Sequence, residues 1–163
     1  MADVAEATKN PAATLLAEIS RTNVVMLGLA DGDAEMRPMV PHVEDALIYF
    51  FTRTSGALTA QVGLGATGRI ALIGKDQDFY GWLEGSLVQN AERATIDRLW
   101  SPTVAAWYKQ GKNDPEVSLL MFTPREGKIW VASDSTLLFA WEMAKALTTG
   151  DEPDVSTALS VHF

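Results

Sequence analysis

The segment YFFTRTSG at residues 49–56 passes within two positions from aromatic side chains to hydroxyl groups and a guanidinium. Thr52, Arg53, Thr54 and Ser55 follow a β-prone run, and a glycine comes next. Hydroxyls, a guanidinium and exposed amides at the start of a helix are groups that bind phosphate. The same residues also suit an ordinary connection from strand to helix, with Ser55 as the helix cap. Both interpretations stand at this point.

The segment MRPMV at residues 36–40 places an arginine among methionines in an otherwise apolar stretch. Pro38 and Pro41 cannot donate to a strand ladder, so they predict an edge strand or a bulge. Backbone groups that are freed from the ladder can meet a ligand, and Arg37 would add charge and planar hydrogen bonding. The alternative is an outward-facing arginine on an edge strand.

Two tryptophans lie seven positions apart in IDRLWSPTVAAWYKQGKNDPE, residues 96–116. Trp100 and Trp107 would share one face of a continuous helix, but Pro102 interrupts it. Large aromatic side chains at helical spacing usually belong to a core or an interface. The two residues therefore do not identify a ligand by themselves.

Residues for acid–base or metal chemistry are scarce. The only histidines are His42 and His162, and there is no cysteine. A zinc site needs several such ligands and a serine hydrolase triad needs a placed histidine, so both classes are poorly supported. The Asp76/Asp78 pair and the DGD at 31–33 suit turn chemistry alone. We therefore assign no catalytic residue and expect no metal.

The composition favours one globular domain and excludes several partners. The chain has 163 residues, 47% of them hydrophobic, and a net charge of −8, with a mean hydropathy of +0.03. Nucleic acid and anionic membranes are disfavoured because no basic cluster exists. No apolar run approaches the roughly 18 residues of a membrane span, and the acidic N-terminus has no signal core. The lack of cysteine fits a cytoplasmic location.

Hydrophobic periodicity and turn residues predict a mainly β fold of the α+β class. We expect strands at 24–30, 34–43, 46–52, 69–74, 79–89, 117–124 and 127–132, with the last two forming a hairpin around REG at 125–127. We expect helices at 11–22, after Ser55, at 92–100, from Pro102 to a stop at Gly111, and at 135–147. Strands without regular βαβ alternation favour an antiparallel barrel decorated by helices. GLGATG at 63–68 lacks the spacing of a dinucleotide motif.

The expected domain spans residues 12–148. Residues 1–11 are expected to be a flexible lead, and residues 149–163 a loose acidic tail.

Taken in order, the segments MLGL, MRPM, IYFFTRTS, GKDQDFYGWLEGSL, DRLWSPTVAAWYKQGKNDP and IWVASDSTL form a recognisable series between about residues 14 and 147. The series resembles the pyridoxamine 5'-phosphate oxidase-like FMN-binding split-barrel family, and within it the bacterial general stress protein subfamily. The run DRLW-P-AAWY-GK-DP is its most specific part.

The resemblance implies a six-stranded split barrel that forms a homodimer, with two FMN molecules in the grooves between protomers. It implies that Arg37, Pro38 and Met39 lie along the isoalloxazine ring. It further implies the following contacts: Phe51 and Thr52 continue that wall, Arg53, Thr54 and Ser55 with Leu58 hold the ribityl and phosphate groups, and Trp100 and Trp107 pack the protomers, with Trp107 bordering the flavin groove.

One departure from the family concerns the phosphate. Many members have a lysine or arginine shortly after the loop serine, where this sequence has GAL at 56–58. A phosphate without a charged partner loses its strongest hydrogen bonds, so Arg53, Arg37 or Lys75 would have to compensate. The C-terminus also lacks the basic residues that hold substrate phosphate in true pyridoxamine 5'-phosphate oxidase, which disfavours vitamin B6 oxidation.

Three functions remain open at this point. The first is an FMN-dependent oxidoreductase fed by NADH, NADPH or another small donor. The second is a flavin-binding stress protein without turnover. The third is a partner-binding dimer without flavin. The acidic composition disfavours a deazaflavin in place of FMN, because that cofactor has a long acidic tail.

Overall fold

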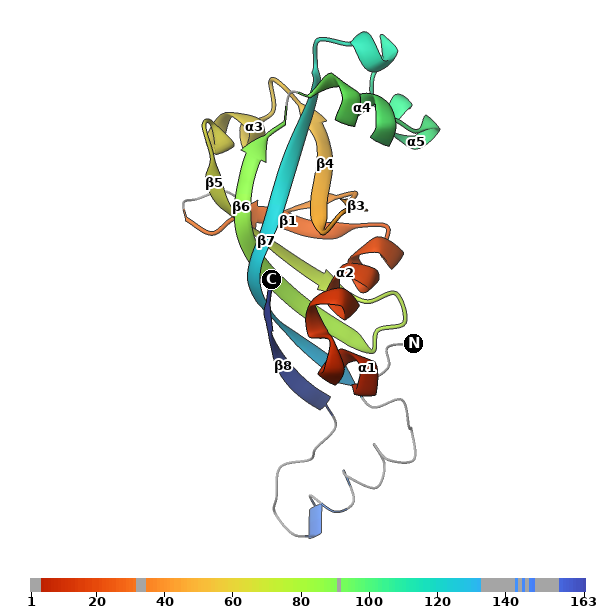
Figure 1. Ribbon diagram of the computed structural model, residues 1–163, viewed down its shortest axis with the longest axis vertical. Helices are drawn as coiled ribbons and strands as arrows, with labels where there is room; N and C mark the ends of the chain where they lie inside the picture. Colours follow the sequence, from red (N-terminus) through yellow and green to blue (C-terminus); the bar gives the residue numbers. More distant parts are fainter. Residues whose placement is uncertain are drawn as a thin grey trace.

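The structure is a computed structural model that describes residues 4–31, 35–90, 92–132 and 156–163, together with 143, 145, 147 and 148. Its elements are α1 (Val4–Lys9), α2 (Pro11–Arg21), β1 (Val25–Leu29), β2 (Arg37–Met39), β3 (His42–Glu44), β4 (Leu47–Arg53), α3 (Ala57–Val62), β5 (Ala66–Ile73), β6 (Phe79–Gln89), α4 (Arg93–Leu99), α5 (Pro102–Ala105), the 3-10 helix η1 (Gly111–Asn113), β7 (Val117–Ala132) and β8 (Ser156–His162) (Figure 1). Most of the helix expected at 135–147 lies outside the described residues.

The strands form one antiparallel sheet in the order β2-β1-β5-β6-β7-β4-β3, and β8 pairs with β7 off this path. The two edge strands, β2 and β3, are separated in the chain by only Val40 and Pro41. Opposite edges that are joined by two residues must lie close together, so the sheet curls round on itself. The expected antiparallel barrel decorated by helices is confirmed as a half-barrel. Among the described residues the sheet has eight strands, whereas the resemblance implies six.

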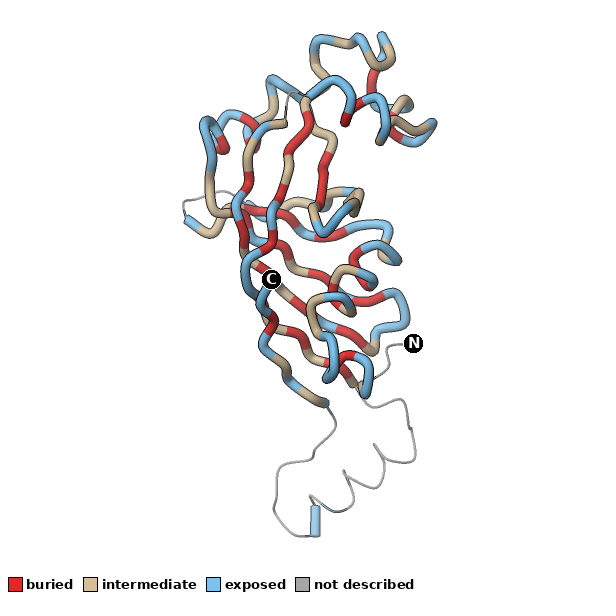
Figure 2. The backbone as a smooth tube through the Cα atoms, viewed as in Figure 1, coloured by how far each residue is buried: buried red, intermediate tan, exposed pale blue. Residues whose placement is uncertain are grey.

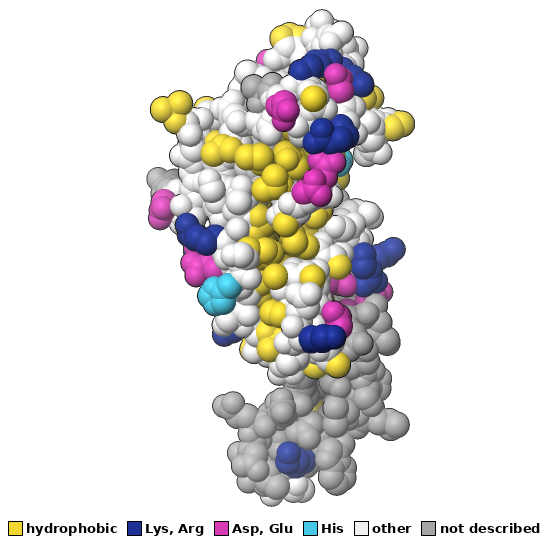
Figure 3. All heavy atoms as spheres, in the orientation of Figure 1, with side chains coloured by type: hydrophobic (Ala, Val, Ile, Leu, Met, Phe, Trp, Pro, Cys, Tyr) yellow, Lys and Arg dark blue, Asp and Glu magenta, His cyan; other side chains and the backbone are white. Residues whose placement is uncertain are grey.

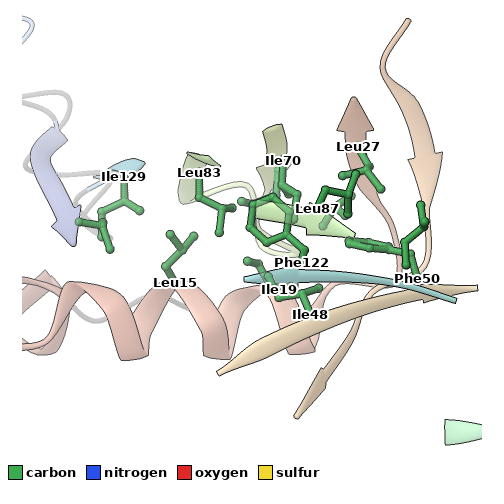
Figure 4. Packing of buried hydrophobic residues seen from close by; sticks show 14 of the residues in the cluster. Leu15, Ile19, Leu27, Ile48, Phe50, Ile70, Leu83, Leu87, Phe122 and Ile129 are labelled. Carbon is green, nitrogen blue, oxygen red and sulfur yellow. The ribbon is translucent and has the colours of Figure 1, made fainter. Parts of the chain in front are cut away.

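The interior of the half-barrel holds the main core. Along β6, Phe79, Leu83 and Leu87 are fully buried, whereas Tyr80 and Ser86 point outward, and Figure 2 shows this alternation on neighbouring strands. This period of two is what a sheet with one covered face requires. Leu15 and Ile19, one turn apart on α2, pack into the interior, as Figure 4 shows.

A second, smaller cluster lies on the opposite face of the sheet. Tyr49 of β4 and Leu119 of β7 are covered there by Ile96 of α4. Ser101 accepts a hydrogen bond from the Val104 amide and caps α5, which confirms the predicted serine-proline helix start. The predicted stop at Gly111 is wrong, because α5 ends at Ala105.

The strand expected at 34–43 is interrupted. β2 and β3 are separate three-residue strands at the two edges of the sheet, in agreement with the edge position that the prolines predict. Pro38 pairs with Met26 of β1, and its missing N–H leaves no acceptor of the sheet unsatisfied, because β2 has no neighbour on its other side among the described residues.

The hairpin expected around REG is wrong, because β7 runs unbroken from Val117 to Ala132. Its first part pairs with β4 and its last part, from Glu126, pairs with β8. Pro124 lies between the two partners, where its missing N–H costs the sheet nothing. The register with β6 shifts between Glu84 and Gly85, and this bulge takes up the extra residue.

Both chain ends contain regular structure. Residues 4–9, expected to be flexible, form α1, whose Ala7 is buried in the main core. Residues 156–162, expected in a loose tail, form β8, and Val161 is fully buried. The acidic residues at 151–154 indicated a loose tail, although the residues after them alternate between apolar and polar as a strand does.

Candidate functional site

The loop at residues 53–55 leads from the end of β4 to α3 and is bound to the start of β7. The Thr54 amide donates to the Glu116 carbonyl at 3.0 Å, and its hydroxyl donates to the Pro115 carbonyl at 3.1 Å. Ser55 donates from its hydroxyl at 2.5 Å, and from its amide at 3.4 Å, to one carboxylate oxygen of Glu116. Ser55 is therefore not the helix cap: Gly56 occupies that position.

Arg53 is oriented toward the segment after α5. Its guanidinium donates to the Trp107 carbonyl at 3.1 Å and lies 5.9 Å from the centre of the Tyr108 ring. Tyr108 in turn donates from its hydroxyl to the Thr52 carbonyl at 2.6 Å. Burial raises the pKa of Tyr108, so its hydroxyl stays protonated as a donor at neutral pH. These bonds fix the end of β4 against the α5 segment.

Four aromatic rings form a continuous series beside this loop. His42 meets Phe51 edge-on at 5.5 Å, Phe51 meets Trp100 at 5.8 Å, and Trp100 meets Tyr108 at 5.8 Å. Trp100 thus packs within its own chain. Trp107 differs, because 69% of its surface is exposed.

His42 serves packing at the edge of the sheet. Burial lowers its pKa, so the imidazole is neutral at pH 7. Within the described residues, no group of three or more His, Asp or Glu side chains is placed to hold a metal ion.

Arg37 points to the interior side of the sheet, because it pairs directly with Leu27, whose side chain is fully buried in the core. Its Nε is buried and has no hydrogen-bond partner in the described part of the chain. Met39, two residues on, packs against the same core. A buried donor without a partner costs free energy in the unliganded protein, which is typical of a position that serves a ligand.

Two expected contributors lie elsewhere. Leu58 is 1% exposed and belongs to the main core, so its side chain faces away from solvent. Lys75 follows β5, whereas α3 precedes β5, so the strand's full length separates Lys75 from the loop. The neighbouring Asp76 accepts a hydrogen bond from Arg21 at the end of α2. Lys75 therefore does not join residues 53–55 within one chain.

The strands that carry the remaining expected residues are consecutive. β2 holds Arg37, Pro38 and Met39, β3 follows after two residues, and β4 ends in Phe51 and Thr52. His42 of β3 joins them by its ring contact with Phe51. The structure thus joins β3 to the end of β4, and β2 ends two residues before β3.

Sequence reasoning missed Glu116 and Tyr108. Glu116 reaches the loop through the pairing of β4 with β7, in which Arg53 lies opposite Val117, and Tyr108 reaches β4 through its bond to the Thr52 carbonyl. The turn residues NDP at 113–115 were visible in the sequence and mark the chain reversal that delivers Glu116 to the loop. Only the register shows which loop it meets.

Comparison with known proteins adds the family. Residues 10–154 match the family described as "Pyridoxamine 5'-phosphate oxidase like". None of the curated proteins that were compared matches the chain. In the part of the chain that the structure describes, no helix is long and apolar enough to cross a membrane.

Three solved structures are similar in fold and sequence. One, named for general stress protein 26 of Jannaschia sp. CCS1, is 29% identical over 91% of this chain and 95% of its own, with a TM-score of 0.75. A second, from Xanthomonas citri, is named as a general stress FMN/FAD binding protein and is 36% identical over 76% of this chain and 89% of its own, with a TM-score of 0.70. The third, a general stress family protein of Xanthomonas campestris pv. campestris, is 35% identical over 76% and 89%, with a TM-score of 0.66.

The half-barrel with its decorating helices is the fold of the FMN-binding split-barrel class. The chain belongs to the pyridoxamine 5'-phosphate oxidase-like family, and its structural neighbours are general stress proteins.

Proposed function

We propose that this chain binds FMN and acts as an FMN-dependent oxidoreductase of the general stress protein type. The observation that carries the proposal is the 36% identity to a protein named for FMN/FAD binding. The chain's own residues fit a flavin, since the edge strand β2 holds a buried donor, Arg37 Nε, that has no partner among the described residues.

Arg37, Pro38 and Met39 would lie along the isoalloxazine ring, and Phe51 and Thr52 would continue that wall. Arg37 would place a guanidinium at the polar edge of the ring, near N1 and O2, where negative charge is best stabilised. The loop at 53–55 would hold the ribityl and phosphate groups with its hydroxyls and amides.

FMN would supply the redox chemistry when bound, and NADH or NADPH is the donor class that we propose. The protein's part would be to bind, orient and polarise the ring, which requires no acid–base side chain. The scarcity of histidine and cysteine is therefore compatible with this function. The lack of cysteine also leads us to propose a cytoplasmic location.

A second copy of this chain is the partner that we propose for the outer face of the sheet. Met26 of β1 pairs with Pro38 of β2 on one side and with Ala71 of β5 on the other. Two residues further along β5, Ile73 pairs with Tyr80 of β6. Met26, Ile73 and Tyr80 are 39%, 59% and 42% exposed. Exposed apolar groups in one contiguous area are typical of an interface. Figure 3 shows a further band of hydrophobic side chains with charged groups on both sides.

The Trp107 side chain is the other exposed group that we assign to the protomer interface and the flavin groove. It follows α5 and its backbone carbonyl accepts from Arg53 of the loop. A large exposed tryptophan beside a proposed cofactor site is suited to covering a flat ring in an adjoining protomer.

A flavin-binding protein without turnover is the second candidate. It is favoured by the absence of an obvious substrate anchor, and by the absence of a basic residue at 56–58. A titration of apoprotein with FMN, followed by flavin fluorescence, tests both candidates: we expect binding at one FMN per protomer. Reduction of the bound flavin by NADH or NADPH then separates the enzyme from the binder. Protein that takes up no FMN contradicts both.

A further inference from the structure

The amide and hydroxyl donors of Thr54 and Ser55 and the amide of Gly56 are engaged within the chain. The Thr54 amide and hydroxyl donate to backbone carbonyls of Glu116 and Pro115. The Ser55 amide and hydroxyl both donate to the Glu116 carboxylate. The Gly56 amide donates to the Arg53 carbonyl at 2.9 Å. A phosphate that is to bind these donors must therefore replace an existing acceptor.

The Glu116 carboxylate is the acceptor most like a phosphate. It presents an anionic oxygen to a serine hydroxyl and to that serine's own amide, which is how a phosphate oxygen is bound. No ion pair joins this anion to a cation in the described part of the chain: residues 56–58 are Gly, Ala and Leu, and the Arg53 guanidinium donates to the Trp107 carbonyl. A carboxylate and a phosphate at the same donors repel each other.

The backbone of Glu116 is fixed independently of its carboxylate. Its amide donates to the Asp114 side chain at 3.0 Å, and its carbonyl accepts from the Thr54 amide at 3.0 Å. Rotation of the Glu116 side chain can free both Ser55 donors without moving the strand or the loop. Another anion can thus replace the Glu116 carboxylate as the acceptor for the Ser55 amide and hydroxyl.

We propose that Glu116 is a specificity-determining residue that competes with the flavin phosphate for Ser55, so that this chain discriminates less between FMN and unphosphorylated riboflavin than a loop without the carboxylate would. This inference rests on the proposed flavin site. FMN binding requires the Glu116 side chain to leave the loop, whereas riboflavin binding does not.

The test compares the dissociation constants of FMN and riboflavin, both measured by flavin fluorescence, in the wild type and in Glu116→Gln and Glu116→Ala. Glutamine keeps an acceptor for Ser55 but removes the charge, and alanine removes both. We expect FMN to bind roughly tenfold more tightly to each variant, and riboflavin to be unchanged. Glu126→Gln is the matched control, because it removes the same charge from an exposed position at the far half of β7.

Four results would overturn the inference. Unchanged FMN affinity in both Glu116 variants would show that the carboxylate does not compete. Equal gains for FMN and riboflavin would show an effect that is independent of phosphate, and weaker FMN binding would show that Glu116 supports the site. If neither the wild type nor any variant binds FMN while all remain folded, the proposed function fails together with the inference. In the first three results the wild type binds FMN, so they defeat the inference alone.

Discussion

At the scale of a single residue, Arg37 has a buried donor that lowers stability and that the proposed flavin site would satisfy. Its Nε is buried and finds no partner in the part of the chain that the structure describes, although its strand lies at the edge of the sheet, where exposed alternatives exist. An unsatisfied buried donor costs about 1–3 kcal/mol. Such a cost is expected where a ligand supplies the missing acceptor.

Arg37→Met should therefore stabilise the protein without flavin and weaken FMN binding. Methionine preserves much of the side-chain volume but removes the unpaired donor, so we expect the free energy of unfolding in urea to rise by about 1 kcal/mol. Loss of a charged contact should raise the FMN dissociation constant about tenfold. Arg125→Met, at an exposed position on β7, should change neither quantity. Unchanged FMN affinity in the Arg37 variant would remove Arg37 from the site.

His42 should make the free energy of unfolding depend on pH at pH values above those at which the carboxylates titrate. Burial lowers its folded-state pKa below the ordinary value of 6.5. The unfolded chain then binds more protons, so the free energy of unfolding should decrease as the pH falls below about 6.5. The carboxyls whose pKa is lowered, such as Asp97 and Asp114, reduce the free energy of unfolding only as the pH falls below about 4.

Urea unfolding of the wild type and of His42→Gln between pH 7.5 and 5 would measure this effect. The decrease should be reduced in His42→Gln and retained in His162→Gln, whose histidine is exposed. A decrease that persists in full without His42 would contradict its assignment to a buried neutral imidazole.

Individual site residues were predictable from sequence only where a local rule applies. Pro38 and Pro41 predict an edge strand from their own chemistry, and the structure confirms it. The contact of Ser55 with Glu116 joins positions 61 residues apart and depends on strand register. The sequence therefore allows Ser55 to be a helix cap as well as a phosphate ligand, because it shows only the near neighbours of this residue.

At the scale of elements, the pairing of β6 with β7 is the least predictable feature. Its two decisive residues are glycines. A Cβ on Gly85 would overlap the Thr123 carbonyl, and one on Gly127 would overlap the Trp82 carbonyl. In sequence, Arg125–Gly127 looks like a turn, since glycine after two charged residues usually marks one. In the structure these residues continue the strand through a bulge.

Gly85→Ala should destabilise the half-barrel, because the added methyl group meets backbone atoms of the paired strand. We expect the free energy of unfolding to fall by roughly 2–4 kcal/mol. The neighbouring Ser86→Ala changes an exposed side chain and should stay within about 0.5 kcal/mol of the wild type. Equal stability of the two variants would show that the bulge can relax, contrary to the close packing described.

At the scale of the whole molecule, the exposed outer face of the sheet predicts a dimer. Ile73 is 59% exposed and pairs with Tyr80, itself 42% exposed, in a contiguous apolar area. Composition and periodicity predicted the antiparallel barrel and the resemblance suggested the dimer, but neither indicated which face remains open. That face follows from the strand order.

Ile73→Glu should weaken self-association at least about tenfold, because a carboxylate would be buried without a partner. Sedimentation analysis at several concentrations would measure it. Leu64→Glu places the same charge at a fully exposed position in the turn before β5 and serves as the control. Equal association of both variants would place the interface elsewhere.

Native mass spectrometry of the protein after addition of FMN tests the central claim most directly. The account predicts a single assembly of two chains and two FMN molecules. A flavin-free protein at FMN concentrations that saturate flavoproteins would contradict it, and so would FMN bound to a single chain with no dimer.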